Sequence, residues 1–348
     1  MRDVLLSVIV PTYNMELYLS RCLQSLLLED VKDYVEIIVI NDGSRDCSSQ
    51  IAHQFQEKYG CDFLVIIDKE NAGYGSVINR GIQVANGKYI KICDSDDWFE
   101  ANGFISFVQQ LKNIDADLVY NKYSKEYVQY RKSVVMASPM LDDVEMGKVY
   151  DIECVKLERL LCLPEITYKA EILRRTNLIL LEKTLYTDLQ YVTFPIGMVE
   201  SIAFTDVLLY RYFIGRSDQS ISQQSKEKNI GHLEMVIETL VGFYKNTELS
   251  LYKQNLVKKL IAEGYTTILC TYLLGFYNNR KYALLKLEKV RNHIYNNDPD
   301  IYHLLITGKY LPNRLVRLYT KYPWLEFLLV YIYHANIKIR SAFYKYIK

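Results

Sequence analysis

KYIKICDSDDW, residues 88–98, joins an apolar run to a turn that carries three aspartates in four positions, Asp94, Asp96 and Asp97. The run has the length and composition of a buried strand. Carboxylates this close together repel one another, so the turn calls for a compensating positive charge. Mg²⁺ and Mn²⁺ take carboxylate oxygens, usually one or two, and fill their other positions with water and phosphate. The stretch therefore predicts a strand whose end holds a cation and a phosphate-bearing ligand.

Working outward, the first 125 residues alternate between apolar runs and segments with helical spacing. Three runs precede the acidic turn, LLSVIVPTYN (5–14), VEIIVINDGS (35–44) and CDFLVIIDKENAG (61–73), and ADLVYNKYS (116–124) follows it. Segments with apolar residues at helical spacing lie between them, over 15–28, 47–60, 76–87 and 103–114. Strands that are apolar throughout and separated by single helices predict an α/β fold, with a doubly wound, mostly parallel sheet covered by helices on both faces.

The rest of the chain predicts a second region of a different kind. Short apolar segments return over 166–215, and a Ser-, Gln- and Lys-rich connector follows. Beyond it the pattern is helical to the end, with one stripe at Leu233, Val236, Ile237, Leu240 and Val241. We therefore place an α/β domain at residues 1–222 and a helical carboxyl-terminal domain at residues 223–348.

Composition excludes several classes of protein. The net charge of +1 gives no reason to expect nucleic acid as a partner. Seven cysteines without a CxxC pair indicate reduced thiols and a cytoplasmic protein. No secretory signal is evident, no window is apolar enough for a membrane span, and the five histidines form no zinc-binding pattern.

Four strand-end turns, PTYN (11–14), NDGS (41–44), KENAG (69–73) and DSDD (94–97), should open onto one crevice, because ligands bind beyond the carboxyl ends of parallel strands. Their order and spacing resemble those of family 2 glycosyltransferases with the GT-A fold, closely over residues 5–125 and loosely over 165–222. The resemblance implies an inverting, metal-dependent enzyme that moves a sugar from a nucleotide-diphosphate donor, most often a UDP-sugar. The acceptor would be a hydroxyl of a glycan, lipid-linked or protein-linked molecule in bacterial cell-surface polysaccharide or glycoconjugate synthesis.

The resemblance also implies roles for individual residues. Asp42 would accept a hydrogen bond from the base, and Asp96 would be the principal ligand of Mn²⁺ or Mg²⁺, assisted by Asp94. Two arginines, in a segment that resembles the family's flexible closing loop over the diphosphate (210–222), are candidate phosphate contacts. The full set of implied donor-binding residues is Pro11, Tyr13, Asn14, Asp42, Asn71, Gly73, Asp94, Ser95, Arg211 and Arg216.

The implied general base is Asp188, in LEKTLYTDLQYVTFP (181–195). The family commonly has Glu-Asp at this place, whereas Thr187 precedes Asp188 here. A purely structural role for Asp188 at the start of a helix stays open, since Asp is favoured there. A second departure lies in the helix after the Asn-x-Gly turn, where Ile78 stands in the place of the usual arginine. Arg80 follows two positions later, on another side of the helix.

The carboxyl-terminal tail is basic and aromatic. Residues 309–348 hold eight Lys or Arg and one Glu, a net +7, so the remainder of the chain sums to −6. Such a segment suits the surface of an anionic membrane and predicts peripheral contact at its inner face. Packing of the tail as a helical cap is the alternative, and the two are compatible.

Rival functions remain at this point. A nucleotide-dependent dehydrogenase needs G-x-G-x-x-G after the first strand, where PTYN stands instead. A sugar-nucleotide pyrophosphorylase would need an early Gly-rich loop with a Lys. A non-catalytic partner that binds a nucleotide-sugar is the alternative that the Thr187 and Ile78 departures leave open.

Overall fold

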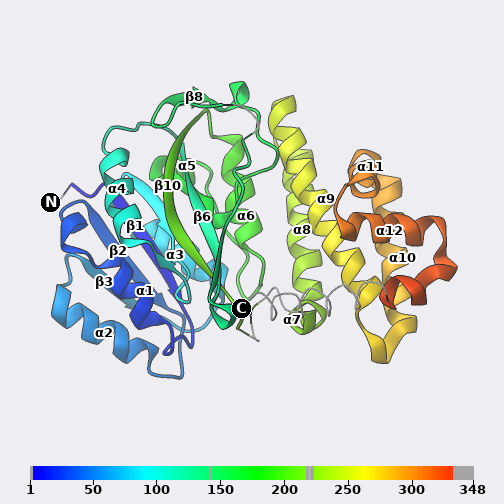
Figure 1. Cartoon of the computed structure of the whole chain (residues 1–348), viewed down its shortest axis with the longest axis horizontal. Helices are drawn as coiled ribbons and strands as arrows, with labels where there is room; N and C mark the ends of the chain where they lie inside the picture. Colours follow the sequence, from blue (N-terminus) through cyan, green and yellow to red (C-terminus); the bar gives the residue numbers. More distant parts are fainter. Residues whose placement is uncertain (1–2, 141–142, 217–218, 220–222, 332–348) are drawn as a thin grey trace. The chain divides into compact units, whose positions relative to one another are not determined.

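The computed structural model describes residues 3–140, 143–216, 219 and 223–331. The chain divides into two compact units, Met1–Ile214 and Gly215–Lys348. The boundary predicted at residue 222 lies outside the described residues. Each unit is described by itself below, with the labels of Figure 1.

The first unit is built on one sheet whose first four strands are parallel neighbours. They are β1 (Leu6–Thr12), β2 (Val35–Asn41), β3 (Leu64–Asp68) and β4 (Tyr89–Ile92). β1 lies between β2 and β4, and β3 pairs with β2. All residues of β1, β2 and β4 are buried, which explains why their sequences are apolar without alternation.

Helices cover both faces of these strands. Leu6, Val8 and Val10 share a buried cluster with α1 (Leu19–Leu26), α2 (Ser48–Tyr59) and α4 (Ala101–Leu111). Ile9 points to the other face, where Gly81 of α3 (Tyr74–Val84) lies directly against it. The predicted doubly wound α/β sheet is therefore confirmed.

The second half of the sheet is mixed. Its order is β3-β2-β1-β4-β9-β6-β10-β5, with β7 beside β6 and β8 beside β10. β9 (Ile166–Lys169) is antiparallel to both β4 and β6 (Leu118–Tyr127), and β10 (Ser201–Ile214) is parallel to β6. β4, β6 and β10 therefore end at the same edge of the sheet. Figure 1 shows β6 and β10 side by side. The remaining elements of this unit are β5 (Trp98–Phe99), β7 (Lys132–Val135), β8 (Val149–Asp151), α5 (Ala170–Arg175) and α6 (Asp188–Thr193).

A lysine lies in the centre of this sheet. Lys91 of β4 is fully buried and donates hydrogen bonds to Asn121 Oδ1 at 2.7 Å and to the carbonyls of Pro164 and Ile166 at 3.2 and 3.0 Å. Burial lowers its pKa to about 7. The lysine joins β4 to β6 and to the start of β9, and so fixes the irregular region beside the predicted strands.

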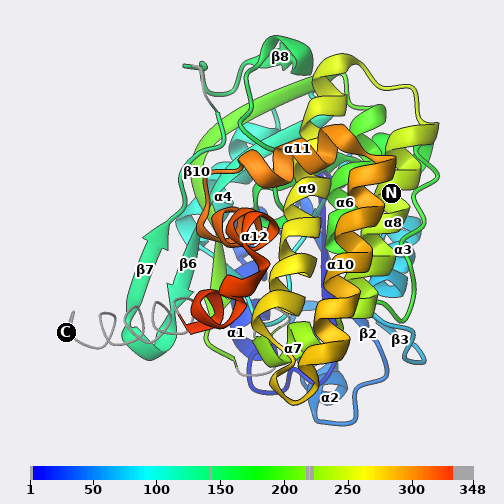
Figure 2. The ribbon, with the colours of Figure 1, turned by 90° about the vertical axis from the view of Figure 1, so that its right-hand side faces the viewer.

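The second unit is helical, as predicted. It contains α7 (Gln223–Lys228), α8 (Ile230–Asn246), α9 (Leu251–Leu274), α10 (Arg280–Asn297), α11 (Pro299–Thr307) and α12 (Leu311–Lys321). α9 packs against α8, α10, α11 and α12, and is buried on several sides (Figure 2). The predicted stripe Leu233–Val241 on α8 is buried. Among the described residues, no helix has the length and apolar character that crossing a bilayer requires.

Candidate functional site

The carboxyl ends of the parallel strands place the predicted turns along one edge of the sheet. β1, β2, β3 and β4 end at Thr12, Asn41, Asp68 and Ile92. Because these strands are parallel neighbours, the turns PTYN, NDGS, KENAG and DSDD follow at the same edge. The hydrogen bonds between the turns show how they are held together.

Asp42 is the centre of the contacts between the second and third turns. Its buried carboxylate accepts hydrogen bonds from Lys69 Nζ, from the amide of Ala72 at 3.0 Å and from the amide of Gly73 at 2.8 Å. The Asn71 side chain donates to the Asp42 carbonyl at 2.9 Å. A carboxylate has about four acceptor positions. The three inward contacts of Asp42 therefore shape the 69–73 turn and leave about one acceptor position for the predicted bond to a base.

The first turn is tied to the second through Asn14. Its backbone has φ of 53°, its amide donates to Ser44 Oγ at 3.0 Å, and its side-chain oxygen accepts from the Arg45 amide at 2.8 Å. Tyr13 beside it is 42% exposed and offers an open aromatic ring. Pro11 is buried within β1, and its carbonyl accepts a hydrogen bond from Ser95 Oγ at 2.7 Å. Ser95 thus points into the protein.

The acidic turn separates its three carboxylates. Asp97 is fully buried and accepts hydrogen bonds from Tyr210 Oη at 2.6 Å and the Phe213 amide at 2.7 Å. Burial, followed by Asp96 and Asp94, raises the pKa of Asp97 well above its usual range. Asp94 accepts from Tyr74 Oη at 2.7 Å, whereas Asp96 is 9% exposed. Asp97 consequently joins the turn to the end of β10.

Asp188 is the first residue of α6 and lies 91 positions after Asp97 in the chain. Burial raises its pKa, while the backbone amides of Asp188 and Leu189 oppose the shift. Burial and then Asp94 raise the pKa of Tyr74 well above normal, with a smaller effect of Asp188. Burial also raises the pKa of Tyr212, with contributions from four carboxylates: Asp97, Asp94, Asp96 and Asp188. Tyr74 and Tyr212 therefore lie within electrostatic reach both of the acidic turn and of Asp188.

The segment before Asp188 is fixed to the start of α3. The Asn79 side chain donates to the Leu180 carbonyl at 3.0 Å and accepts from the Leu180 amide at 2.8 Å. The Lys183 amide donates to the Ala72 carbonyl at 2.6 Å. Close packing also requires Gly73, which has φ of 87° and whose absent Cβ would lie 2.9 Å from the Lys183 nitrogen. The third turn and the segment leading to Asp188 form one connected structure.

The arginines have different surroundings. Arg211 Nη1 forms an ion pair with Glu126 Oε1 at 3.1 Å and a hydrogen bond with Ser124 Oγ at 3.2 Å. The predicted phosphate contact Arg211 is therefore already paired with a carboxylate. Residues 210–214 are part of β10, not of a loop, because they pair in register with β6. Arg216 belongs to the second unit, and the rest of the segment predicted to close over the diphosphate includes residues outside the described ranges. On α3, Ile78 is buried and Arg80 is exposed.

Three residues of the site escaped the sequence analysis: Lys69, Tyr74 and Tyr212. Lys69 and Tyr74 border the Asn-x-Gly turn, and Tyr212 follows Arg211. Neighbouring residues in the sequence belong to the predicted site, but neither residue type nor spacing predicts that Lys69 contacts Asp42 or that Tyr74 contacts Asp94. The same holds for the electrostatic interaction of Tyr212 with Asp188.

The donor set at the acidic turn fits a hard divalent cation. No group of three or more ligating side chains suited to a metal exists within the described ranges. Asp94 and Asp96 provide two carboxylates, which is the number that Mg²⁺ or Mn²⁺ uses when phosphate and water complete its shell. Asp97 does not add to this set because its two oxygens accept from Tyr210 and Phe213.

Comparison with known proteins gives three findings. The family model "Glycosyl transferase family 2" matches residues 7–145. The sequence is 35% identical to the glycosyltransferase GlyA of Streptococcus pneumoniae serotype 4 over 150 residues, which are 43% of this chain. It is 34% identical to the minor teichoic acid biosynthesis protein GgaB of Bacillus subtilis over 117 residues, which are 32% of this chain. These aligned stretches make up only 20% and 13% of the two relatives.

Among solved structures, the chain is similar to residues 1–349 of S. aureus TarS in complex with UDP-GlcNAc. The TM-score is 0.59 at 18% identity, over 91% of this chain and 92% of that one. At this identity the likeness shows the fold alone. Residues 7–145 thus match glycosyl transferase family 2, and the chain has a GT-A-like α/β fold with a helical carboxyl-terminal region.

Proposed function

We propose that this chain is an inverting glycosyltransferase that moves a sugar from a nucleotide-diphosphate donor, a UDP-sugar, to a hydroxyl of a glycan, lipid-linked or protein-linked acceptor. Its product would belong to cell-surface polysaccharide or glycoconjugate synthesis, which the similarity to the teichoic acid biosynthesis protein GgaB supports. The similarity to TarS, which was solved with UDP-GlcNAc, supports a UDP-sugar as the donor. The observation that carries the proposal is that Tyr74, whose hydroxyl donates to Asp94 at 2.7 Å, also lies within electrostatic reach of Asp188.

The residues can be given complementary roles in this reaction. The nucleoside would lie over the first two turns, against the exposed ring of Tyr13. The Gly73 turn and α3 would border the diphosphate and sugar. Asp94 and Asp96 would hold Mn²⁺ or Mg²⁺, which would neutralise the charge that develops on the departing diphosphate.

Asp188 would act on the acceptor side. Its carboxylate would take the proton of the acceptor hydroxyl while the acceptor oxygen bonds to the anomeric carbon and the bond to the UDP oxygen breaks. Attack opposite the leaving group inverts the anomeric configuration. Burial raises the pKa of Asp188 and so makes its carboxylate a stronger base than an exposed aspartate.

Release of UDP from a panel of UDP-sugars, beginning with UDP-GlcNAc, tests the activity. We expect release with at least one donor in the presence of Mn²⁺, increased by acceptor, and a product whose anomeric signals in NMR show inversion. Tight UDP binding without hydrolysis or transfer from any donor would favour the non-catalytic partner instead.

Chelation and substitution of Asp96 test the cation. We expect Asp96→Ala to abolish both turnover and the Mn²⁺-dependent part of UDP binding, and we expect the same two losses when EDTA is added to the unaltered chain. Asp206→Ala, which changes an exposed aspartate of β10, is the matched control and should behave as the unaltered chain. Full activity of the Asp96 variant would remove the cation from that position.

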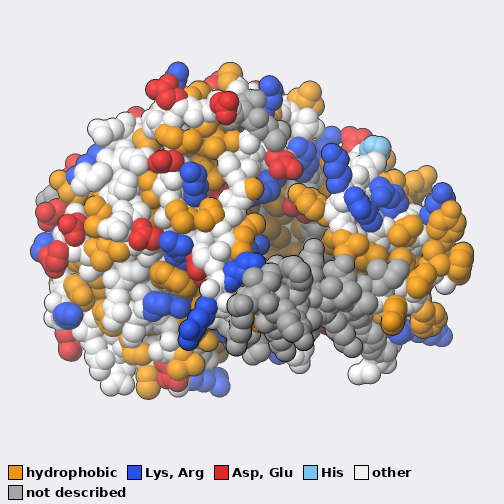
Figure 3. All heavy atoms as spheres, in the orientation of Figure 1, with side chains coloured by type: hydrophobic (Ala, Val, Ile, Leu, Met, Phe, Trp, Pro, Cys, Tyr) orange, Lys and Arg blue, Asp and Glu red, His pale blue; other side chains and the backbone are white. Residues whose placement is uncertain are grey.

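We also propose that the enzyme works at the inner face of the cell membrane, through the end of the helical unit. Residues 326–331 are helical and follow Pro323–Leu325, and the exposed apolar side chains there recur at helical spacing: Trp324, Phe327, Leu328 and Tyr331. Figure 3 shows hydrophobic side chains gathered over this end of the helical unit on the face drawn. Basic residues accompany them on α12, as interfacial binding requires.

A further inference from the structure

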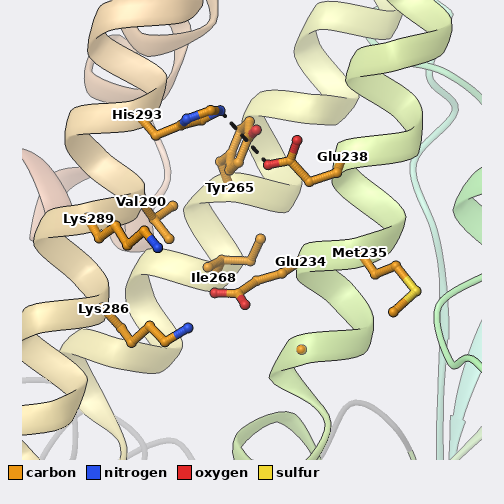
Figure 4. A pocket seen from close by; sticks show the side chains of 10 residues that line it. Glu234, Met235, Glu238, Tyr265, Ile268, Lys286, Lys289, Val290 and His293 are labelled. Atoms are coloured by element: carbon orange, nitrogen blue, oxygen red, sulfur yellow. Dashed lines mark ion pairs between the residues drawn. The ribbon is translucent and has the colours of Figure 1, made fainter.

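The helical unit contains a cavity that the proposed reaction does not use. It has a volume of about 370 Å³ and lies between α8, α9 and α10 (Figure 4). Cavities of this size hold small ligands. Its walls carry opposite charges, with Glu234 and Glu238 on α8 and Lys286 and Lys289 on α10; His293 also lies on the α10 wall.

Each wall is a regular feature of its helix. Glu234 and Glu238 are four residues apart, and Lys286 and Lys289 are three apart, so each pair shares one helix face. Like charges at this spacing destabilise a helix unless an opposite charge compensates them. The two walls approach at one end, where His293 Nε2 lies 4.0 Å from Glu238 Oε1.

The floor contributes an unsatisfied polar group. Tyr265 of α9 is 2% exposed, and its hydroxyl has no hydrogen-bond partner within the described part of the chain. Figure 4 shows this hydroxyl beside the line that joins His293 to Glu238. A buried hydroxyl without a partner costs about 1–3 kcal/mol. A ligand hydroxyl inserted between His293 and Glu238 would supply the missing bond.

The charges select the class of ligand. Two lysines on one wall favour a phosphate, which accepts several charge-assisted hydrogen bonds. The glutamates exclude a ligand that is anionic along its whole length. Neutral hydroxyls suit the α8 wall, because a hydroxyl can donate to Glu234 or Glu238 and can also accept from the Tyr265 hydroxyl on the floor. Ile268 and Val290 give the carbon skeleton an apolar surface.

We infer that this cavity binds the phosphate ester of a sugar or polyol, with the phosphate on Lys286 and Lys289 and the hydroxyls on Glu234, Glu238 and Tyr265. The inference does not rest on the proposed transfer reaction, because all of these residues belong to the helical unit. The ligand could be a free metabolite or one repeat of a phosphate-linked polymer, and the two differ in whether the phosphate is a monoester or a diester.

Methyl NMR of the full chain with ¹³C-labelled methionine tests the inference locally. Met235 lines the cavity, whereas Met198 lies in the first unit. Titration with glycerol 3-phosphate or glucose 1-phosphate should shift the Met235 signal and leave Met198 unchanged. A response to glycerophosphoglycerol as strong as to the monoesters would assign a polymer repeat, and a response to the monoesters alone would assign a free metabolite. Binding of inorganic phosphate as tightly as of the esters, or no shift with any ester, would overturn the inference.

Substitutions separate the ligand's contacts from a structural role. Lys286→Gln with Lys289→Gln should weaken binding of glycerol 3-phosphate at least about tenfold, since each charge-assisted bond is worth that factor. Lys281→Gln removes an exposed lysine of the same helix outside the cavity and should leave the affinity unchanged.

Tyr265→Phe should weaken binding about fivefold without lowering the melting temperature, because the hydroxyl it removes has no partner in the protein. A melting temperature that falls together with affinity would show that the hydroxyl is structural, and unchanged affinity in the double lysine variant would overturn the phosphate assignment.

Discussion

Burial decides what each carboxylate at the edge of the sheet can do. Asp97 is enclosed and saturated by Tyr210 and Phe213, so it serves the structure of the acidic turn. Asp42 is enclosed as well and organises the neighbouring turn through Lys69, Ala72 and Gly73. Asp188 is half-buried by comparison, and backbone amides at the start of α6 donate to its carboxylate. It combines a helix-terminal position with a raised pKa, which suits a base.

Asp188→Asn keeps the shape of the side chain and removes its basicity. We expect UDP binding near that of the unaltered chain and transfer reduced about 10²-fold or more, the usual scale for loss of a general base. Asp206→Asn is the matched control on an exposed aspartate. If donor binding collapses while residual chemistry persists, Asp188 is structural.

The pH profile of kcat/KM provides a second test of Asp188. A base must be deprotonated to act, so activity should fall as the pH drops through the pKa of Asp188. Because burial raises this pKa above the 3.8 of an ordinary aspartate, the acid limb should lie above that of an exposed carboxylate. The residual activity of Asp188→Asn should lack this limb, and an identical limb in the variant would assign it to another group.

The residue scale also shows how far the sequence could predict the site. Asp94, Asp96 and Asn71 follow strands whose apolar runs are unmistakable, so their position at one edge could be deduced from strand order alone. The inward turn of Ser95 toward Pro11 and the pairing of Arg211 with Glu126 could not, because both depend on contacts between distant segments. The position of Lys91 within an apolar run did not predict that three oxygens of distant segments would accept hydrogen bonds from its ammonium group.

At the scale of elements, α3 connects the Asn-x-Gly turn to the segment that leads to Asp188. It begins at Tyr74, directly after the Asn-x-Gly turn, and Asn79 one turn later holds Leu180. Gly75 allows the 180–183 segment to approach, since a Cβ there would lie 2.1 Å from the Leu181 carbonyl oxygen. Sequence patterns predicted the helix and the parallel strands, which local periodicity encodes. They did not predict the antiparallel β9, whose place depends on the irregular region before it.

Gly75→Ala should therefore displace the segment that leads to Asp188. We expect a loss of unfolding free energy of about 1–3 kcal/mol, the usual cost of overpacking, and a larger loss of transfer than of UDP binding. Urea unfolding followed by the fluorescence of Trp98, in a Trp324→Phe background, measures the first unit, because the chain has two tryptophans.

Gly242→Ala provides the matched control for this change. Gly242 lies within α8 and has no atom within 4 Å of the position of an added Cβ. Alanine there should raise the stability of its helix by about 0.5–1 kcal/mol and leave transfer unchanged. Equal effects of the two substitutions on transfer would show that the contact with Leu181 is not what matters at Gly75.

At the scale of the whole chain, the charge distribution is uneven. Residues 309–348 carry +7 within a chain of net +1. In the described part of this tail, Lys309, Arg314, Arg317 and Lys321 face a single acid, Glu326, which is paired with Arg280. Exposed aromatic side chains therefore lie in a locally cationic segment, which favours an anionic lipid surface over a neutral one.

Binding to vesicles tests this property of the whole chain. We expect the full chain to bind vesicles that contain phosphatidylglycerol more strongly than vesicles of phosphatidylcholine alone, and more strongly at low salt than at high salt. Trp324 and Phe327 are 77% and 81% exposed, and burial of one large apolar side chain contributes about 1.5–3 kcal/mol. Trp324→Ser with Phe327→Ser should therefore weaken binding at least about tenfold. Leu285→Ser, which removes an exposed leucine of α10, should have a much smaller effect. Equal losses in the two variants, or binding that is indifferent to both lipid charge and salt, would leave the tail with a packing role only.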